Sequence, residues 1–544
     1  MGQTLYYNGT ILTMEDRIPY TDAVLTENGR ILDIGKYSEL AERARPDAVK
    51  ADLQGNVMLP GFIDPHSHFT ACASHTMEAD LDGARDFEEI ISRIREFIRE
   101  QKPEEGRWIQ ASGYDHNRLE ERTHPGRKVL DQAAPRNPLI LKHQSGHMGV
   151  FNTMALNLLE VTADTQAPQG GLIETENGLA TGYMEEAAFL AFQSRIPMPS
   201  PDDFLRAYGR AQELYASHGI TTVQEGMMTD KLLPLYQMLT KADLLRLDLI
   251  AYADIKSSGA ITEEMKDYVK TYKSHIKIGG YKMFLDGSPQ GRTAWMREPY
   301  EPADGLNQPS DYRGYNTLED EEVYGNIMKS EKEGMQLLAH CNGDMACQQY
   351  LDQLEAVYGH LDRQRGGKTA FYPGDIRPVM VHAQLLGLDQ LDRVKELKVI
   401  PSFFVAHVYH WGDVHIRNFG MDRASHISPA ASSFKKGILF TFHQDSPVIR
   451  PDMLETLWCA ANRMTRSGTV LGTQERLPVW EALKAVTVNG AYQYFEEHEK
   501  GSIIGGKTAD FTVLDRNPLT VEEGDIRNIQ VLATIKEDRL IWKR

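Results

Sequence analysis

The sequence predicts an α/β fold, a (β/α)8 TIM barrel with a small β-sandwich domain formed from both chain ends, and two observations carry this prediction. Apolar, strand-like runs alternate with helical patterns through the middle of the chain, at 57–63, 219–225, 247–254, 276–285, 335–340, 378–383, 399–405 and 437–443. Eight strands that alternate with helices are typical of such a barrel. Short β-type runs occupy both ends of the chain, where they pair most simply as one small sheet domain.

The β-type runs at the N-terminal end lie at 5–7, 10–13, 23–26 and 30–34. Asn28-Gly29 separates the last two runs, and this dipeptide is a strong signal for a hairpin turn. The C-terminal runs lie at 509–514, 530–535 and 540–542. We therefore predict two parts of a β-sandwich, 1–56 and 497–544, on either side of a barrel at 57–496.

The barrel pattern has one irregular gap, between the first two strand-like runs. This gap is far too long for a single crossover helix, so it predicts an insertion at about 70–218. A helix over 86–101 is predicted inside it by an apolar stripe at Ile90, Ile91, Ile94, Phe97 and Ile98. Later strands are separated by helical patterns at 321–328, 345–358 and 391–397.

The composition excludes several classes of partner. The chain has 544 residues, 41% of them hydrophobic, and a formal charge of −18, so phosphate backbones and anionic lipids would repel it. No apolar run approaches the ~18 residues that a membrane span needs. Four sparse cysteines form neither a disulfide framework nor a Cys-x-x-Cys pair. We expect a cytoplasmic protein that binds neither nucleic acid nor membrane; a homo-oligomer stays open.

Two histidines, His66 and His68, follow the first apolar run directly. Residues i and i+2 of a strand point to the same face, so this spacing directs two imidazoles toward one point. Such a pair begins a metal site, although an isolated His-x-His motif is also found in ordinary turns.

Further polar residues occur at the ends of later strand-like runs. Lys282 lies inside the fourth run, His340 ends the fifth, His382 ends the sixth, and Asp445 follows the eighth. Because the active site of a barrel gathers at the C-terminal ends of its strands, these residues would converge with His66 and His68. Their combination predicts a metal site, whereas a single histidine in such a position would more often be a satisfied core residue.

This set of residues resembles the amidohydrolase superfamily, in particular its family 3 branch, which includes enzymes like N-substituted formamide deformylase. The resemblance covers nearly the whole chain, and its segments lie at 59–68, 286–294, 340–344, 406–413, 445–448 and 501–510. It implies a metal-dependent hydrolase that cleaves a C–N bond other than a peptide bond, with a small-molecule amide, N-formyl or N-acyl, as its substrate.

The resemblance also implies roles for the metal-site residues. We expect His66, His68, Lys282, His340, His382 and Asp445 to bind one or two divalent ions, with Zn²⁺ as the expected metal. Asp445 would act as the general acid and base, since it could accept a proton from water and deliver it to the leaving nitrogen. The alternative for Asp445 is a helix N-cap.

Lys282 requires separate treatment, because an ammonium group cannot bind a cation. Its amine can add CO₂ and become a carbamate whose oxygens bridge two metals, as in related amidohydrolases. The alternative is a buried lysine that forms an ion pair with Asp286 or Glu225.

Four residues are candidates for binding the substrate. Tyr114 and His147 lie in the insertion, in segments that resemble ones near the metals of relatives, and His407 and Trp411 follow the seventh strand. A structural role is an equal alternative for each.

Two other functions stay open at this point. A deaminase of the same superfamily would release ammonia instead of a carboxylate, and usually lacks the lysine on the fourth strand. A non-catalytic regulatory protein on the same scaffold would not need the complete ligand set.

Overall fold

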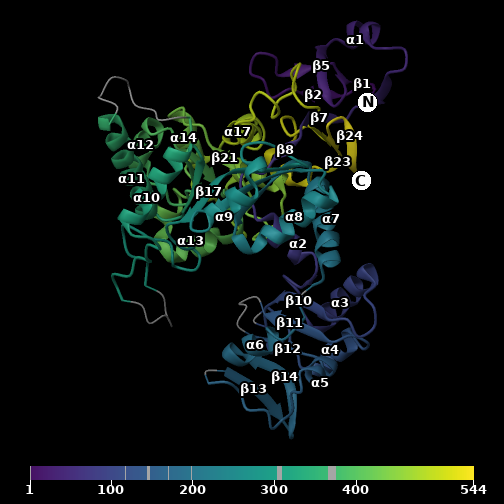
Figure 1. Cartoon of the computed structure of the whole chain (residues 1–544), viewed down its shortest axis with the longest axis vertical. Coiled ribbons are helices and arrows are strands. Elements are labelled where there is room, and N and C mark those ends of the chain that lie inside the picture. Colours follow the sequence, from purple (N-terminus) through teal and green to yellow (C-terminus); the bar gives the residue numbers. More distant parts are fainter. Residues whose placement is uncertain are drawn as a thin grey trace. The chain divides into compact units, whose positions relative to one another are not determined.

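The computed structural model describes residues 2–544 except 117, 144–147, 170, 198, 303–308 and 365–374. The chain forms two compact units. Unit 1 comprises Met1–Thr70 and Ala211–Arg544, and unit 2 comprises Ala71–Arg210. In Figure 1 the strands labelled β10–β14 belong to unit 2, and each unit is described by itself below.

Unit 1 contains a parallel sheet of eight strands. In order along the sheet they are β8 (Phe62–Ile63), β15 (Ile220–Met228), β16 (Asp248–Asp254), β17 (Ile276–Phe284), β18 (Gln336–Cys341), β19 (Val379–His382), β20 (Ile400–Phe403) and β21 (Thr441–Phe442). All seven neighbouring pairs are parallel. This order follows the chain, which confirms the predicted α/β class with its eight alternating strands.

The two outermost strands of this sheet, β8 and β21, are followed by segments that meet. The amide of Asp445 donates to the carbonyl of His66 at 3.2 Å, and the amide of His68 donates to the carbonyl of Ser446 at 2.8 Å. No strand ladder joins β8 to β21 among the described residues. The chain segments that carry the predicted ligands are therefore linked directly by backbone hydrogen bonds.

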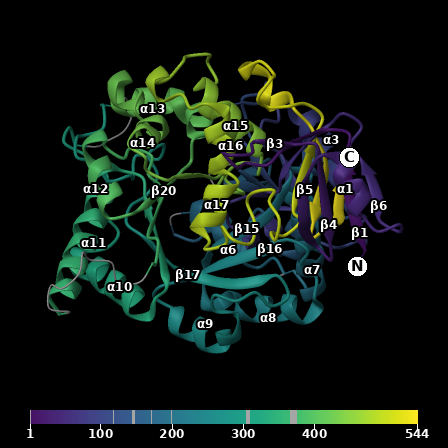
Figure 2. The same cartoon turned by 90° about the horizontal axis from the view of Figure 1, so that it is seen from above.

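Helices follow the parallel strands along the chain, and those labelled α8 to α12 lie at the edge of the view in Figure 2. The helices are α8 (Leu233–Ala242), α9 (Ser258–Glu264), α10 (Asp320–Glu333), α11 (Asp344–Gln364), α12 (Leu391–Glu396), α13 (His407–Ala424), α14 (Ala430–Lys435), α15 (Met453–Asn462), α16 (Val479–Ala485) and α17 (Val488–Gln493). The predicted patterns at 321–328, 345–358 and 391–397 fall on α10, α11 and α12. Acidic residues in the first turn of α10 interact favourably with the positive end of the helix dipole. Gly334 ends this helix in the left-handed conformation, with φ 63°.

The predicted first strand, 57–63, is wrong as a single element. Its first half is β7 (Val57–Pro60), which pairs with β22 (Phe511–Leu514) in another sheet, and only Phe62 and Ile63 join the eight-stranded sheet. The change of sheet occurs at Gly61, where a Cβ would lie 2.5 Å from side-chain atoms of Thr221. A continuous apolar run can thus serve two sheets, because apolar character does not reveal the partner of a strand.

Strands from both ends of the chain form two further sheets in unit 1. One contains β5 (Arg30–Gly35), β4 (Ala23–Glu27), β1 (Gln3–Tyr7) and β6 (Val49–Asp52), with α1 (Tyr37–Arg43) following β5. The other contains β24 (Arg539–Lys543), β23 (Val531–Lys536), β22, β7, β2 (Thr10–Leu12) and β3 (Tyr20–Thr21). Residues of both sheets share one buried cluster, which includes Tyr6, Val24, Met58 and Phe511. The predicted hairpin at Asn28-Gly29 is confirmed, since both residues have positive φ, 52° and 81°.

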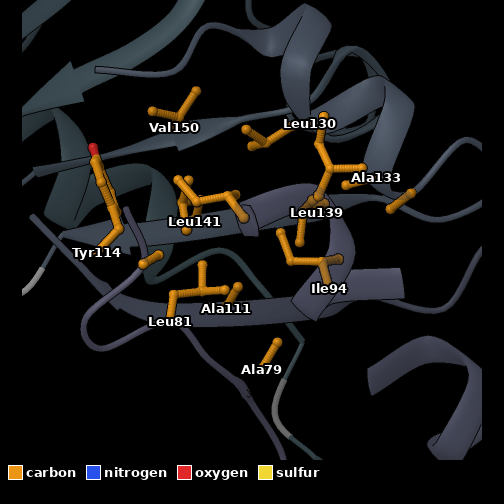
Figure 3. Close-up of a cluster of buried hydrophobic side chains, with 14 of the residues drawn as sticks. Ala79, Leu81, Ile94, Ala111, Tyr114, Leu130, Ala133, Leu139, Leu141 and Val150 are labelled. Carbon is orange, nitrogen blue, oxygen red and sulfur yellow. The ribbon is translucent and has the colours of Figure 1, made fainter. Parts of the chain in front are cut away.

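Unit 2 is built on a six-stranded sheet. Its strands are β13 (Gly171–Glu176), β14 (Leu179–Glu185), β12 (Met148–Phe151), β11 (Leu139–His143), β10 (Ile109–Tyr114) and β9 (Ala79–Asp80). Its helices are α3 (Phe87–Gln101), α4 (Arg127–Ala133), α5 (Thr153–Leu158) and α6 (Glu186–Gln193), while α2 (Phe69–His75) and α7 (Pro201–Ser217) cross its boundaries. The predicted helix over 86–101 is confirmed: Asp86 caps α3, and Ile90, Ile91 and Ile94 are buried. Figure 3 shows part of the core that they enter.

A buried network of charges joins the eight-stranded sheet of unit 1 to its C-terminal segment. The carboxylate of Asp248 on β16 binds Lys500 and lies 2.9 Å from Nζ of Lys536. Lys536 also lies 3.0 Å from Asp510, and Lys500 lies 3.0 Å from Glu496. Burial opposes ionisation of Asp248, but the two lysines outweigh it and hold the pKa of this carboxyl well below its usual range.

We expect Asp248→Asn to lower the free energy of unfolding by about 3–5 kcal/mol, because it leaves two buried ammonium groups without their shared partner. Since the folded-state pKa of Asp248 is depressed, its contribution is present above the unfolded-state pKa and is lost as the pH falls through the folded-state value. Urea denaturation at neutral pH measures the effect. Asp267→Asn is the control, because Asp267 pairs with Lys273 on the surface. Equal stability of Asp248→Asn and the wild type would contradict the role of the network.

In the described part of the chain, no helix combines the length and the apolar character that a membrane span requires. All four cysteines are buried, and none of them forms a disulfide within the part of the chain that the structure describes.

Candidate metal centre

The residues predicted to bind metal all lie at one edge of the parallel sheet of unit 1. His66 and His68 follow β8, Lys282 lies near the end of β17, His340 lies in β18, His382 ends β19, and Asp445 follows β21. Because the strands are parallel, their C-terminal ends share an edge. Backbone strain accompanies this placement, since His382 and Asp445 have left-handed φ values of 72° and 54°.

His66, His68 and Asp445 converge on one point. Oδ1 of Asp445 lies 3.5 Å from Nε2 of His66 and 3.4 Å from Nε2 of His68. Ligand atoms around a tetrahedral Zn²⁺ ion lie roughly 3.3 Å apart, given its bond lengths. Oδ1 of Asp445 is buried and has no hydrogen-bond partner among the described residues, which is costly unless a cation satisfies it. The three residues therefore fit a divalent ion of the kind that imidazole and carboxylate prefer.

His382 and His340 extend this group. Nε2 of His382 lies 3.9 Å from Oδ2 of Asp445, and the rings of His340 and His382 are 4.6 Å apart at their centroids. Nδ1 of His340 lies 3.2 Å from Oδ1 of Asp286, whose carboxylate also accepts hydrogen bonds from the amides of Asn342 and Gly343. A carboxylate held in this way orients an imidazole. The other ring nitrogen of His340, Nε2, lies 3.3 Å from Nδ2 of Asn342, so a metal bound there would replace this contact.

Lys282 is fully buried beside the three converging residues. Its Nζ lies 3.3 Å from Nε2 of His66 and 5.2 Å from the centroid of the Phe284 ring. Burial lowers the pKa of this amine, although Asp445 opposes the change. Among the described residues no carboxylate forms an ion pair with Lys282.

The two carboxylates considered as ion-pair partners of Lys282 have other contacts. Asp286 binds His340 and three backbone amides, those of Trp295, Asn342 and Gly343. Glu225 accepts hydrogen bonds from the amide of Thr70 at 2.8 Å and the hydroxyl of Tyr236 at 3.0 Å. Neither pairs with the lysine in the described structure.

The imidazoles of His66, His68 and His382 are held in their neutral form. Burial lowers the pKa of His66 and His382 well below the usual range, and it lowers the pKa of His68 to about 3. The nearby Lys282 contributes to each shift. Neutral imidazole is the form that binds metals.

Two residues that sequence reasoning missed hold the histidines in place. Oε1 of Gln224 on β15 lies 2.6 Å from Nδ1 of His66, while its Nε2 donates to the carbonyl of Pro65 and to Tyr494. His443 connects two strands, since its Nε2 lies 3.1 Å from Nδ1 of His382 and its Nδ1 lies 2.9 Å from Oγ of Ser402. In the sequence, Gln224 is marked only as a polar residue late in the second apolar run, and His443 only as a histidine two residues before Asp445.

Aromatic side chains of α13 lie beside the histidines. His407 is buried, its Nδ1 lies 3.0 Å from Nε2 of His415, and its ring is 4.5 Å from that of Trp411. Phe404 contacts both His407 and Trp411, and its ring centroid lies 5.3 Å from that of His443. His407 and Trp411 are thus connected to the metal-site residues through Phe404, and their role toward a substrate stays a prediction.

The two substrate-binding candidates of the insertion belong to unit 2. Tyr114 is fully buried at one end of the core cluster in Figure 3, and its hydroxyl lies 2.9 Å from Nδ1 of His124. His147 lies outside the described residues. A substrate role for either residue is untested.

Comparisons with known proteins agree with this geometry. The amidohydrolase family matches residues 51–541. The chain belongs to the amidohydrolase family. N-substituted formamide deformylase of Arthrobacter pascens is 28% identical over 574 residues, covering 100% of this chain and 99% of that protein. Protein LONG AFTER FAR-RED 3 of Arabidopsis thaliana is 28% identical over 550 residues, covering 98% and 90%.

One solved structure has the same fold as this chain. The crystal structure of an uncharacterized metal-dependent hydrolase from Pyrococcus horikoshii OT3 matches with a TM-score of 0.73 and 24% identity, covering 96% of this chain and 99% of that one. This likeness supports the fold over nearly the full length.

Proposed function

We propose that this hydrolase of the amidohydrolase family cleaves an amide, N-formyl or N-acyl, C–N bond outside peptides. The observation that carries the proposal is the convergence of two imidazoles on the unpartnered Oδ1 of Asp445, beside a buried lysine. Supporting it, the deformylase of Arthrobacter pascens is similar over the whole chain.

The residues that would hold divalent metal, with Zn²⁺ as the proposed ion, are His66, His68, His340, His382, Asp445 and a carboxylated Lys282. When bound, the metal supplies a water of lowered pKa and polarises the substrate carbonyl. Lys282 is suited to carboxylation, because its buried amine has a lowered pKa and the neutral amine is the form that attacks CO₂. Loss of the amine proton then leaves a carbamate, which can bridge two ions.

Asp445 is the proposed general acid and base. Its carboxylate would accept the proton of the attacking water and deliver it to the leaving nitrogen, so that an amine departs instead of an amide anion. Oδ1 of Asp445 faces the imidazoles of His66 and His68. It has no hydrogen-bond partner among the described residues. Gln224, Asp286 and His443 would keep the imidazoles oriented throughout.

His407 and Trp411 are proposed to shape the substrate site of unit 1. Loops at the C-terminal edge of a barrel supply most of the discrimination between substrates. The aromatic contacts among Phe404, His407 and Trp411 suit a partly apolar amide substituent.

A second proposal concerns the closure of the parallel sheet and the domain formed by the two chain ends. We propose that the eight-stranded sheet closes as a (β/α)8 barrel within 61–496, and that 1–60 and 497–544 form a β-sandwich domain, because β7 pairs with β22. The cluster shared by the two terminal sheets supports the sandwich, and the hydrogen bonds between the segments after β8 and β21 support closure.

The function is tested by product analysis with the metal-loaded protein on N-substituted formyl, acetyl and cyclic amides. We expect a carboxylate and a substituted amine from at least one of them. Trp411→Ala should change the relative kcat/KM among the amides at constant metal content. Trp480→Ala is the matched control, because Trp480 lies on α16 and its indole nitrogen donates to Asp16.

Other results would redirect or reject the proposal. Release of ammonia from aminated ring substrates, without any amide hydrolysis, would indicate a deaminase. Absence of turnover with every compound, by protein that binds metal fully, would favour a regulatory role on the same scaffold.

A further inference from the structure

Unit 2 carries its own cluster of metal-binding residue types at the end of two neighbouring strands. Strands β10 and β11 are parallel, and Tyr114 at the end of the first is paired with His143 at the end of the second. Asp115 and His116 follow β10 directly. The C-terminal ends of adjacent parallel strands thus bring Asp115, His116 and His143 together, and we call these three residues the second cluster.

The ligand atoms of the second cluster form a closed triangle. Nδ1 of His116 lies 3.3 Å from Nε2 of His143, Oδ1 of Asp115 lies 3.6 Å from the same Nε2, and it lies 3.9 Å from the same Nδ1. The three distances therefore join the same three atoms, one from each residue, and a single ion could contact all of them. These separations are close to the roughly 3.3 Å between ligand atoms of a tetrahedral Zn²⁺ ion.

The separations at the candidate centre of unit 1 are slightly shorter, since Asp445 lies 3.5 Å and 3.4 Å from two imidazole nitrogens. The two groups also share their chemistry, two imidazoles and one carboxylate. We propose that the second cluster binds a divalent transition-metal ion, such as Zn²⁺, wholly within unit 2. Water would complete the coordination.

The surroundings of the second cluster restrict its side chains. His143 is only 10% exposed, and its ring packs edge-on against Tyr114 with centroids 5.2 Å apart. The ring of His124 lies 4.0 Å from that of His116 and 4.2 Å from that of Tyr183, and its Nδ1 lies 2.9 Å from the Tyr114 hydroxyl. These contacts fix the imidazole of His116 from one side and that of His143 from another. A preorganised ligand set loses less conformational entropy when it binds an ion.

The carboxylate of Asp115 divides its two oxygens between different partners. Oδ1 faces the imidazoles, whereas Oδ2 lies 3.8 Å from Nε of Arg118. The guanidinium therefore lies near the oxygen that does not face the imidazoles. The alternative without metal is a direct hydrogen bond between His116 and His143, for which 3.3 Å is long but allowed.

The test locates the ion in the full-length protein. Crystals of the Zn²⁺-loaded chain are measured on both sides of the zinc absorption edge, and bound zinc per chain is counted by elemental analysis in solution. We expect an anomalous peak among Asp115, His116 and His143. The double variant His116→Ala/His143→Gln should lose this peak and one ion per chain. Anomalous density at His66, His68 and Asp445 reports on the other centre and does not count toward this test.

Two further variants keep the result interpretable. Asp115→Asn preserves the size of the side chain and removes its charge, so Zn²⁺ affinity at the second cluster should fall by at least about tenfold even if the double variant folds poorly. His498→Ala is the control, because His498 is exposed and lies 4.0 Å from a single carboxylate, that of Glu497. The proposal is overturned if the wild type shows no peak at the second cluster, or if Asp115→Asn binds Zn²⁺ there as tightly as the wild type.

Discussion

Asp445→Asn should reduce kcat by about 10²–10⁴-fold while the protein keeps its fold and most of its metal. Asparagine has the size of aspartate and retains an oxygen that can face the imidazoles, but it can neither accept the proton of the attacking water nor deliver one to the leaving nitrogen. Steady-state kinetics on the best amide substrate, with bound metal measured in the same sample, separate the two effects. We expect kcat to fall much more than KM rises.

A matched control uses another carboxylate of unit 1. Asp413→Asn removes a carboxylate of α13 that binds Thr465 and Ser467, and its effect on kcat should be small. Near-normal turnover of Asp445→Asn at full metal content would place the base elsewhere. Loss of metal in step with loss of activity would show instead that Asp445 acts only as a ligand.

Much of the parallel sheet could be predicted, because its strands are buried on both faces and are rich in apolar residues. The eight apolar runs fall on the strand positions, and the polar residues at their ends fall on one edge. The exception is the run at 57–63, which divides at Gly61 between two sheets. Which strand pairs with β7 depends on residues more than 400 positions away, at β22, and no local pattern contains that information.

The ligands of the candidate centre were easier to predict than the residues that orient them. A histidine at the end of an apolar strand is conspicuous, whereas Gln224 and Asp286 gain their roles only from tertiary contacts with His66 and His340. The surroundings of Lys282 also depend on tertiary contacts that the local sequence does not show. Its burial could be inferred from its strand, but the missing ion pair with Asp286 or Glu225 follows from the hydrogen bonds that occupy those carboxylates.

Removal of the metal should abolish hydrolysis almost completely, because no other group in the described site could generate a nucleophile of comparable strength at neutral pH. Chelation followed by addition of Zn²⁺ should therefore eliminate and then restore turnover. The variant His66→Ala/His68→Ala should stay inactive after the same treatment, since it lacks two of the converging ligands. Both measurements are best made in the His116→Ala/His143→Gln background, so that any ion at the second cluster does not contribute.

The metal content of that background, with and without His66→Ala/His68→Ala, tests the central claim most directly. We predict one or two divalent ions per chain by elemental analysis when His66 and His68 are present, and loss of tightly bound metal when they are replaced. Equal metal content in the two proteins, or a chain that binds no divalent ion after reconstitution with Zn²⁺, would contradict the claim that His66, His68 and Asp445 form a metal centre.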